Sequence, residues 1–132
     1  VYDQVPDIRK TLLIVDIKGN NYNVIKALST FYKKEPTRNV FFCSFNRKLL
    51  YGLPPEFQKG TTVETTFTNE EYDMITRGLS VVVLHWTCLD HYFISYCKMK
   101  DIKVYTYTHK EDKELEYMYR FNVDAIITNG FN

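Results

Sequence analysis

The stretch LSVVVLHWTCLDHYFISYCKMKDIKVYTYT, Leu79–Thr108, decides the fold. It opens with a nearly continuous apolar run over Leu79–Thr87 and closes with a β-branched and aromatic run over Ile102–Thr108. Between the two runs we predict a helix from about Leu89 to Lys100. Two apolar strands joined by a helix are typical of a βαβ unit, in which the strands are parallel and both faces of the sheet are covered.

The same alternation continues toward both ends of the chain. Before this stretch we predict strands at Leu12–Ile17, Asn39–Phe45 and Thr61–Phe67, and a helix at Val24–Tyr32. After it we predict a helix that ends near Phe121 and a last strand at Val123–Asn129. About six parallel strands alternating with helices predict an α/β fold. Two architectures fit this pattern, a doubly wound open sheet and part of a (β/α) barrel.

Two capping boxes mark helix starts in the second half of the chain. They are TNEE, Thr68 to Glu71, and THKE, Thr108 to Glu111. In this motif the Glu side chain reaches back to the backbone N–H of the Thr, and the Thr side chain accepts from the N–H of the Glu. We therefore predict that helices begin directly after Thr68 and Thr108.

Composition limits the class of protein. The 132 residues are 45% hydrophobic and carry a net charge of +1 with acids and bases well mixed, so we expect one domain and no nucleic-acid partner. No apolar run approaches the roughly 20 residues of a membrane span. We expect the three cysteines to be buried thiols. Because the chain begins at Val1 rather than Met, we expect the true N-terminus elsewhere and predict no compartment.

Polar side chains follow the apolar part of most predicted strands. Asp16 and Lys18 lie two residues apart at the end of the first strand, and His85 directly follows the apolar run of the fourth. Side chains two apart share a strand face, and sites in parallel α/β folds lie at the carboxyl ends of the strands. A carboxylate there suits a hard cation, and an ammonium group suits an anionic group such as a phosphate. An ordinary ion pair is the alternative.

Other candidate residues could have a packing role instead of a role in a site. His85 is either a site residue or a core histidine, and Trp86 is either a pocket wall or a packing residue. Tyr105 and Tyr107 share one face of their strand, where core packing with a polar tip is the alternative to a site. The sequence contains no G-x-G-x-x-G, no Walker loop, no G-x-S-x-G and no zinc spacing, so common nucleotide-binding and hydrolase classes are excluded.

The C-terminal sequence from Ile102 resembles the end of the glycerophosphodiester phosphodiesterase barrel. That family ends with a strand like KVYVWTVN, a helix, and then GVDGIITDYP or ITNRP. Val104 and Tyr105 fit the strand, and Tyr107 stands where the usual Trp would be. VDAIITN, Val123–Asn129, fits the last strand, with Ala125 in place of a Gly.

Three earlier segments agree with the same family in order and spacing. The segment VFFCSFN resembles the family's VIISSFN, IVDIKG resembles NIEIKG, and VVVLHW resembles a strand that often ends in His-Pro. The resemblance implies that residues 1–132 are a single domain, the C-terminal portion of a TIM barrel (strands three to eight) that lacks the first two strands. A whole barrel takes about 250 residues.

The resemblance also implies a reaction and residue roles. The family hydrolyses a glycerophosphodiester, or a related phospholipid head group, to glycerol phosphate and an alcohol, with a divalent cation, Ca or Mg. Asp16 would be a metal ligand, one methylene shorter than the family's Glu, and Lys18 would contact the phosphate. His85 and Tyr107 would be walls of the substrate pocket.

The family's HRG, PENT, E-x-D and HD motifs, which hold its catalytic histidines and most metal ligands, do not occur in this sequence. We therefore assign no catalytic residue and expect the chain alone to be inactive, either as a fragment or as a degenerate relative. A non-catalytic binding or assembly module on the same scaffold is the alternative, and a flavodoxin-like or receiver domain is a third. The edges of the strands Leu12–Ile17 and Val123–Asn129 would favour self-association.

Overall fold

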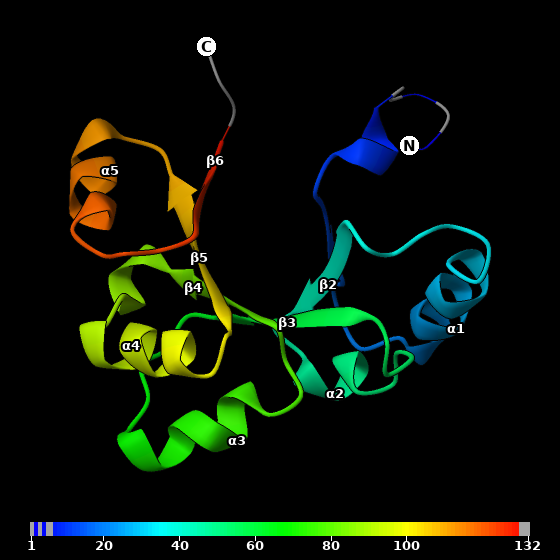
Figure 1. Ribbon diagram of the computed structural model, residues 1–132, viewed down its shortest axis with the longest axis horizontal. Coiled ribbons are helices and arrows are strands. Elements are labelled where there is room, and N and C mark those ends of the chain that lie inside the picture. The colour runs from blue at the N-terminus through cyan, green and yellow to red at the C-terminus, as the bar shows by residue number, and fades with distance from the viewer. Residues whose placement is uncertain (1, 3, 5–6, 130–132) are drawn as a thin grey trace. The chain divides into compact units, whose positions relative to one another are not determined.

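The computed structural model describes residues 2, 4 and 7–129, and it divides into two compact units. The first lies within Val1–Gly60 and the second within Thr61–Asn132. Strand β3 (Gln58–Val63) begins in the first unit and ends in the second (Figure 1). That the chain is a single domain stays a prediction. In the part of the chain described, no helix has the length and apolar character needed to cross a membrane.

The first unit is a βαβ arrangement. Strand β1 (Leu13–Asp16) is followed by helix α1 (Tyr22–Phe31), strand β2 (Val40–Ser44) and the short helix α2 (Arg47–Leu50). The two strands are parallel, and Asp16 lies opposite Cys43. Every residue of β2 is buried, which is why its sequence, VFFCS, has no polar alternation.

Aromatic rings fill the core of the first unit. The ring of Phe42 stacks on Phe57 at 5.0 Å and meets Tyr32 edge-on at 5.2 Å. Lys59 is also buried, and its ammonium group donates to the carbonyls of Pro54 at 2.9 Å and Phe57 at 3.0 Å. Burial of a lysine is tolerated here because backbone oxygens replace its water.

The second unit repeats the strand–helix alternation. Its strands after β3 are β4 (Val81–His85), β5 (Lys103–His109) and β6 (Ala125–Thr128). Its α-helices are α3 (Tyr72–Thr76), α4 (His91–Met99) and α5 (Asp112–Tyr119), with 3-10 turns at Asn69–Glu71 (η2) and Trp86–Cys88 (η3). Strand β5 pairs in parallel with β4 and with β6. The predicted βαβ units are confirmed.

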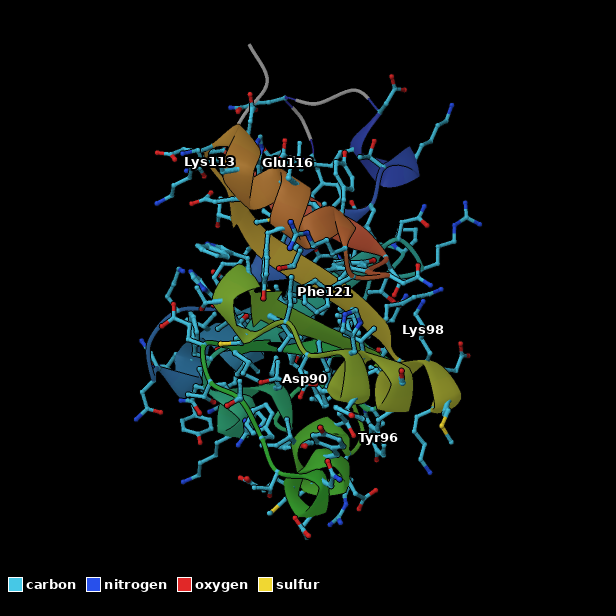
Figure 2. All side chains as sticks on the ribbon, turned by 90° about the vertical axis from the view of Figure 1, so that its left-hand side faces the viewer. Asp90, Tyr96, Lys98, Lys113, Glu116 and Phe121 are labelled. Atoms are coloured by element: carbon cyan, nitrogen blue, oxygen red, sulfur yellow. The ribbon has the colours of Figure 1, made fainter. Side chains whose placement is uncertain are left out.

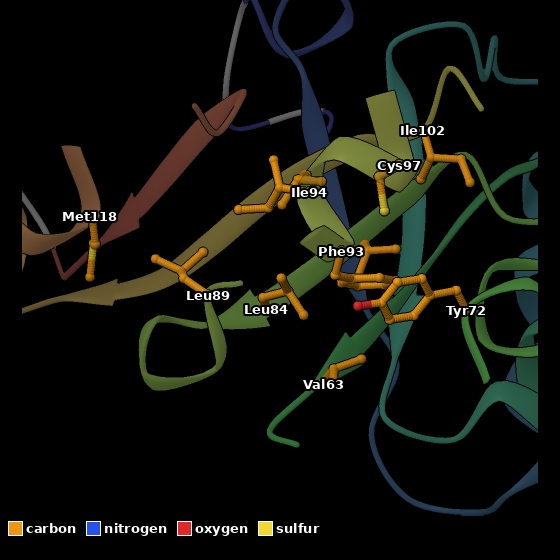
Figure 3. Close-up of a cluster of buried hydrophobic side chains, with 11 residues drawn as sticks. Val63, Tyr72, Leu84, Leu89, Phe93, Ile94, Cys97, Ile102 and Met118 are labelled. Atoms are coloured by element: carbon orange, nitrogen blue, oxygen red, sulfur yellow. The ribbon is translucent and has the colours of Figure 1, made fainter. Parts of the chain in front are cut away.

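Helix α4 covers one face of these strands and forms the main core (Figure 3). Phe93, Ile94 and Cys97 are its buried residues. The cluster they belong to comprises Val63, Tyr72, Val82, Leu84, Leu89, Phe93, Ile94, Cys97, Ile102, Val104 and Met118. All three cysteines are buried and free, as predicted.

Two local predictions differ from the structure. Strand β3 runs from Gln58 to Val63 rather than from Thr61 to Phe67, and residues 64–66 are exposed. Helix α5 begins after Glu111 and not after Thr108, since its capping box is Glu111 with Glu114. The carboxylate of Glu114 accepts from the N–H groups of Lys110 at 3.0 Å and Glu111 at 3.3 Å. The capping box of Thr68 and Glu71 is confirmed.

Candidate functional site

Asp16 and Lys18 form an ion pair at the carboxyl end of β1. The ammonium nitrogen lies 2.7 Å from Oδ2 of Asp16, and the side chains are 38% exposed for Asp16 and 78% exposed for Lys18. The hydrogen bond to Asp16, and then its charge, raise the pKa of Lys18. Ile17 between them is buried and donates its N–H to the carbonyl of Cys43, which fixes the strand end. Lys18, the more exposed partner, therefore presents its ammonium group to solvent at this end of the strand.

Two residues at the carboxyl end of β2 and just after it hold the loop that follows this pair. Ser44 donates its hydroxyl to the carbonyl of Ile17 at 2.7 Å. The amide of Asn46 donates to Oδ1 of Asn20 at 3.1 Å and to the carbonyl of Gly19 at 3.4 Å. Gly19 has φ of +77°, a value that favours glycine. These contacts place Asn46 at the same end of the first unit as Asp16 and Lys18.

A pocket of about 260 Å³ lies at the strand ends of the second unit. It is lined by Glu64, His85, Trp86, Tyr107, Thr108, Lys110 and Glu114. These residues come from the ends of β3 and β4, from β5, and from the loop and first turn of α5. Several strand ends therefore contribute to one pocket, as expected for a parallel sheet.

The aromatic side chains of this pocket hold one another in place. His85 and Tyr107 are opposite each other in the β4–β5 register, and their rings meet edge-on at 5.2 Å. The hydroxyl of Tyr107 donates to the carbonyl of Val63 at 3.2 Å. The backbone N–H of Thr87 donates to Nδ1 of His85 at 3.3 Å, and the hydroxyl of Thr87 lies 2.7 Å from the same nitrogen.

Trp86 both packs and lines the pocket. Its ring lies 5.9 Å from that of Tyr117 and 5.8 Å from that of His85, and it packs against the main core. The two interpretations of Trp86 from the sequence are therefore compatible. Lys110 and Glu114 were not foreseen in the lining, because nothing in the spacing of α5 indicates that its first turn faces the pocket.

The predicted site residues fall in both units. His85 and Tyr107 line the same pocket, and Glu64 lines it too. Asp16 and Lys18 belong to the other unit, so a site that they share with His85 and Tyr107 stays a prediction. The other histidines have structural contacts: His91 stacks on Phe121 at 4.4 Å, and Nδ1 of His109 lies 3.2 Å from the hydroxyl of Thr128.

The residues around Asp16 do not fit a tight divalent-cation site. One carboxylate oxygen is taken by Lys18, and the other lies 3.8 Å from the thiol of Cys43. Over residues 2, 4 and 7–129, no three His, Cys, Asp or Glu side chains gather in a way that could hold a metal ion. Calcium takes 6–8 oxygen ligands and magnesium about six, so one shared carboxylate is too few.

The fold is similar to that of several solved structures. A phosphodiesterase from Oleispira antarctica, in complex with the product sn-glycerol-3-phosphate, has a TM-score of 0.71 at 20% identity over 86% of this chain and 49% of its own. A putative glycerophosphodiester phosphodiesterase from Galdieria sulphuraria has a TM-score of 0.76 at 16% identity over 89% of this chain and 53% of its own. The glycerophosphodiester phosphodiesterase of Thermotoga maritima reaches 0.74 at 15% identity over 96% of this chain and 57% of its own.

No family model matches the sequence, and no curated protein is significantly similar to it. The chain spans about half the length of the structures it resembles. At these identities the similarity shows the fold, which is an α/β partial TIM barrel of the kind found in glycerophosphodiester phosphodiesterases. The predicted fold class is confirmed, and the doubly wound and receiver-like alternatives are not supported.

Proposed function

We propose that this chain is part of a metal-dependent phosphodiester hydrolase that cleaves a glycerophosphodiester, or a related phospholipid head group, into glycerol phosphate and an alcohol. The observation that carries the proposal is the similarity of fold to phosphodiesterases over 86–96% of the chain. Fold alone does not fix function, so the proposal also rests on the chemistry of the strand ends.

Asp16 and Lys18 supply the chemistry that a phosphodiester needs at this edge. Lys18 is the phosphate contact, because its exposed ammonium group is a compact positive charge at a strand end. The carboxylate of Asp16, 2.7 Å away, orients it and raises its pKa. His85 and Tyr107, which line the pocket of the second unit, are the proposed contacts of the alcohol portion.

The proposed hydrolysis also uses a divalent cation, Ca or Mg. When bound in such hydrolases, it polarises the phosphoryl oxygens. Asp16 would give one ligand in the intact protein, and the family motifs that do not occur in this sequence would give the others. General acid–base catalysis typically raises a reaction rate by about 10²–10⁴-fold. No residue of this chain is assigned to that role. We therefore propose that the 132 residues alone do not catalyse the hydrolysis.

The test is release of sn-glycerol 3-phosphate from glycerophosphodiesters with added Mg or Ca. We expect no turnover by the 132-residue chain. We expect turnover by the intact protein, lost in Asp16→Asn and with a raised KM in Lys18→Met, while Asp7→Asn, an exposed carboxylate outside the strand end, has no effect. An intact protein without activity contradicts the proposal, and turnover by the chain alone contradicts its inactivity. Light scattering on the same samples tests self-association through β1 and β6.

A non-catalytic binding module is the second candidate. The pocket of the second unit favours it, because its aromatic and carboxylate lining can hold a ligand without a metal. Saturable binding of a glycerophosphodiester by an intact protein that shows no turnover with either metal would select this candidate.

A further inference from the structure

We propose that the outer face of helix α4 binds an anionic membrane surface. This face consists of Tyr92, Tyr96 and Met99, with Lys98 and the helix-ending Lys100 beside them, and we call it the α4 face. The inference goes beyond the proposed hydrolysis and does not depend on it, because these side chains lie outside the lining of the strand-end pocket.

An aromatic and apolar stripe runs along the side of α4 that faces away from the core. Tyr92, Tyr96 and Met99 are spaced four and then three residues apart, so they lie on one side of the helix. Tyr92 is 79% exposed and Met99 is 83% exposed, whereas Tyr96 is half-buried. The buried residues of α4 lie on its opposite side. The two most exposed members of the stripe are therefore not used to pack α4 in its own unit.

Two lysines flank this stripe. A helix turns by about 100° per residue, which places Lys98 and Lys100 on opposite sides of the line from Tyr92 to Met99. Both lysines are exposed, and the ammonium nitrogen of Lys100 lies 5.9 Å from the centre of the Tyr96 ring. Long lysine side chains keep their charge in water while apolar residues beside them enter a membrane, and tyrosine favours the same interface. The α4 face therefore has the pattern of a helix that lies in a membrane surface.

The charge of the α4 face differs from that of its unit. Residues 61–132 contain seven Lys and Arg and eleven Asp and Glu, which gives 7 − 11 = −4. The segment His91–Lys100 instead contains two lysines and no acidic residue. Figure 2 shows the side of the unit on which α4 lies, with Tyr96 and Lys98 labelled. An anionic surface is therefore attracted at α4 and repelled by most of the unit.

The extent of the stripe favours a membrane over a protein partner. Aromatic side chains bury about 150–250 Å² each, and Tyr96 is already half-buried. The three stripe residues therefore fall short of the roughly 800 Å² that a stable protein interface buries on each partner. A membrane requires no complementary surface, since a few inserted side chains and nearby lysines are enough for reversible binding.

The experiment is co-sedimentation of the protein with vesicles of phosphatidylcholine alone and of equal parts of phosphatidylcholine and phosphatidylserine. We expect binding to the mixed vesicles to be at least about tenfold tighter, because each lysine near an anionic surface contributes about fivefold. In about 1 M salt, where the Debye length is about 3 Å, this difference should largely disappear. Equal binding to both kinds of vesicle at low salt, or no binding to either, would overturn the proposal.

Variants test whether α4 makes the contact. Lys98→Gln should weaken binding to the mixed vesicles about fivefold. Met99→Ser should weaken it about fivefold to tenfold, because the apolar side chain no longer enters the interface. The matched controls are Lys113→Gln on α5 (Figure 2) and Met74→Ser on α3, both at exposed positions. Circular dichroism checks that each variant is folded, and equal losses in the controls would overturn the proposal.

An environment-sensitive fluorescent label distinguishes a membrane from a second copy of the chain. The three native cysteines are buried, so a label reacts first with the exposed thiol of Met99→Cys. We expect its emission to shift to the blue on the mixed vesicles, and we expect no shift for the same label at Met74→Cys. A blue shift of the Met99→Cys label that needs no vesicles and grows with protein concentration would mean that a second copy covers the α4 face, and it would overturn the proposal.

Discussion

Asp124 and Val104 exchange two hydrogen bonds of 2.8 Å. The backbone N–H of Asp124 donates to the carbonyl of Val104, and the carboxylate Oδ2 of Asp124 accepts from the N–H of Val104. Val104 is fully buried in β5, and Asp124 directly precedes β6. The pair therefore fixes the approach to the last strand against the start of β5, a role that the matching of Asp124 to a family motif did not reveal.

Replacing Asp124 should weaken the second unit. Asp124→Ala leaves the buried N–H of Val104 without its carboxylate partner, so we expect the free energy of unfolding to fall by about 1–2 kcal/mol. Asp124→Asn should cost less, because its amide oxygen can still accept. Urea unfolding measures both, and Glu116→Ala on exposed α5 serves as the control. A control as destabilised as Asp124→Ala would show that the effect does not come from this bond.

Alkaline pH should destabilise the protein through Cys97. Burial, and to a lesser extent the charge of Asp124, raises the pKa of the Cys97 thiol to about 12 from 9.0. The thiol's contribution is fully present below pH 9 and is lost as the pH rises toward 12, because the unfolded state ionises first. The loss is about 1.4 kcal/mol per pH unit within this window. The Cys97→Ala protein should be less stable than the wild type at pH 7, and its free energy of unfolding should fall less steeply between pH 9 and 12. The same slope in both proteins, measured by urea unfolding, would contradict this account.

Lys59 should be needed for the loop before β3. Lys59→Met keeps the apolar stem but leaves the carbonyls of Pro54 and Phe57 without their donor, so we expect a loss of about 2 kcal/mol. Lys34→Met, at an exposed lysine, should have little effect.

The titration of Lys59 gives a second readout. Burial lowers the pKa of Lys59 below 10.5. Between this lowered pKa and 10.5, Lys59 holds more protons in the unfolded state than in the folded state. Over this pH window, the group therefore makes the free energy of unfolding rise as the pH increases. The Lys59→Met protein should lack that contribution. The difference in stability between the two proteins should therefore grow across this window, and a constant difference would be inconsistent with the proposed titration.

Gly19 should tolerate asparagine better than alanine. An added Cβ meets no atom within 4 Å, so the cost of Gly19→Ala comes from its φ of +77° and should be about 1 kcal/mol. Asn adopts this conformation more readily, so Gly19→Asn should cost less. Thermal unfolding compares the two, and equal losses would indicate a cause other than the backbone angle.

The sequence was most informative where one strong pattern dominates. Leu79–Thr108 is a βαβ unit because its apolar runs leave no other way to bury both strands. The limits of β3 were wrong because Lys59 and Gln58 look like loop residues, and only the carbonyls around Lys59 explain its burial. The predicted start of α5 was wrong because two capping-box patterns overlap there. The sequence suggests Thr108 with Glu111, but Glu111 forms the capping box with Glu114.

The candidate site was predicted in part for a related reason. His85 and Tyr107 were identified because strand ends are readable from sequence, and their register brings them to one pocket. Glu114 and Lys110 depend on which side of α5 faces the strands, and periodicity does not specify that. The pairing of Asp16 with Lys18 follows from their spacing. The spacing does not show whether Asp16 also binds a metal or only pairs with Lys18.

The order of strand pairing has a consequence for synthesis on the ribosome. Strand β2 pairs with β1, β5 with β4, and β6 with β5, so each of these strands pairs with an earlier one. Strand β4 begins at Val81 and β5 at Lys103, a separation of 103 − 81 = 22 residues, which takes about one to four seconds to translate. Loop closure takes well under a millisecond. Each emerging strand therefore has its partner already synthesised, and the sheet can grow in the direction of translation.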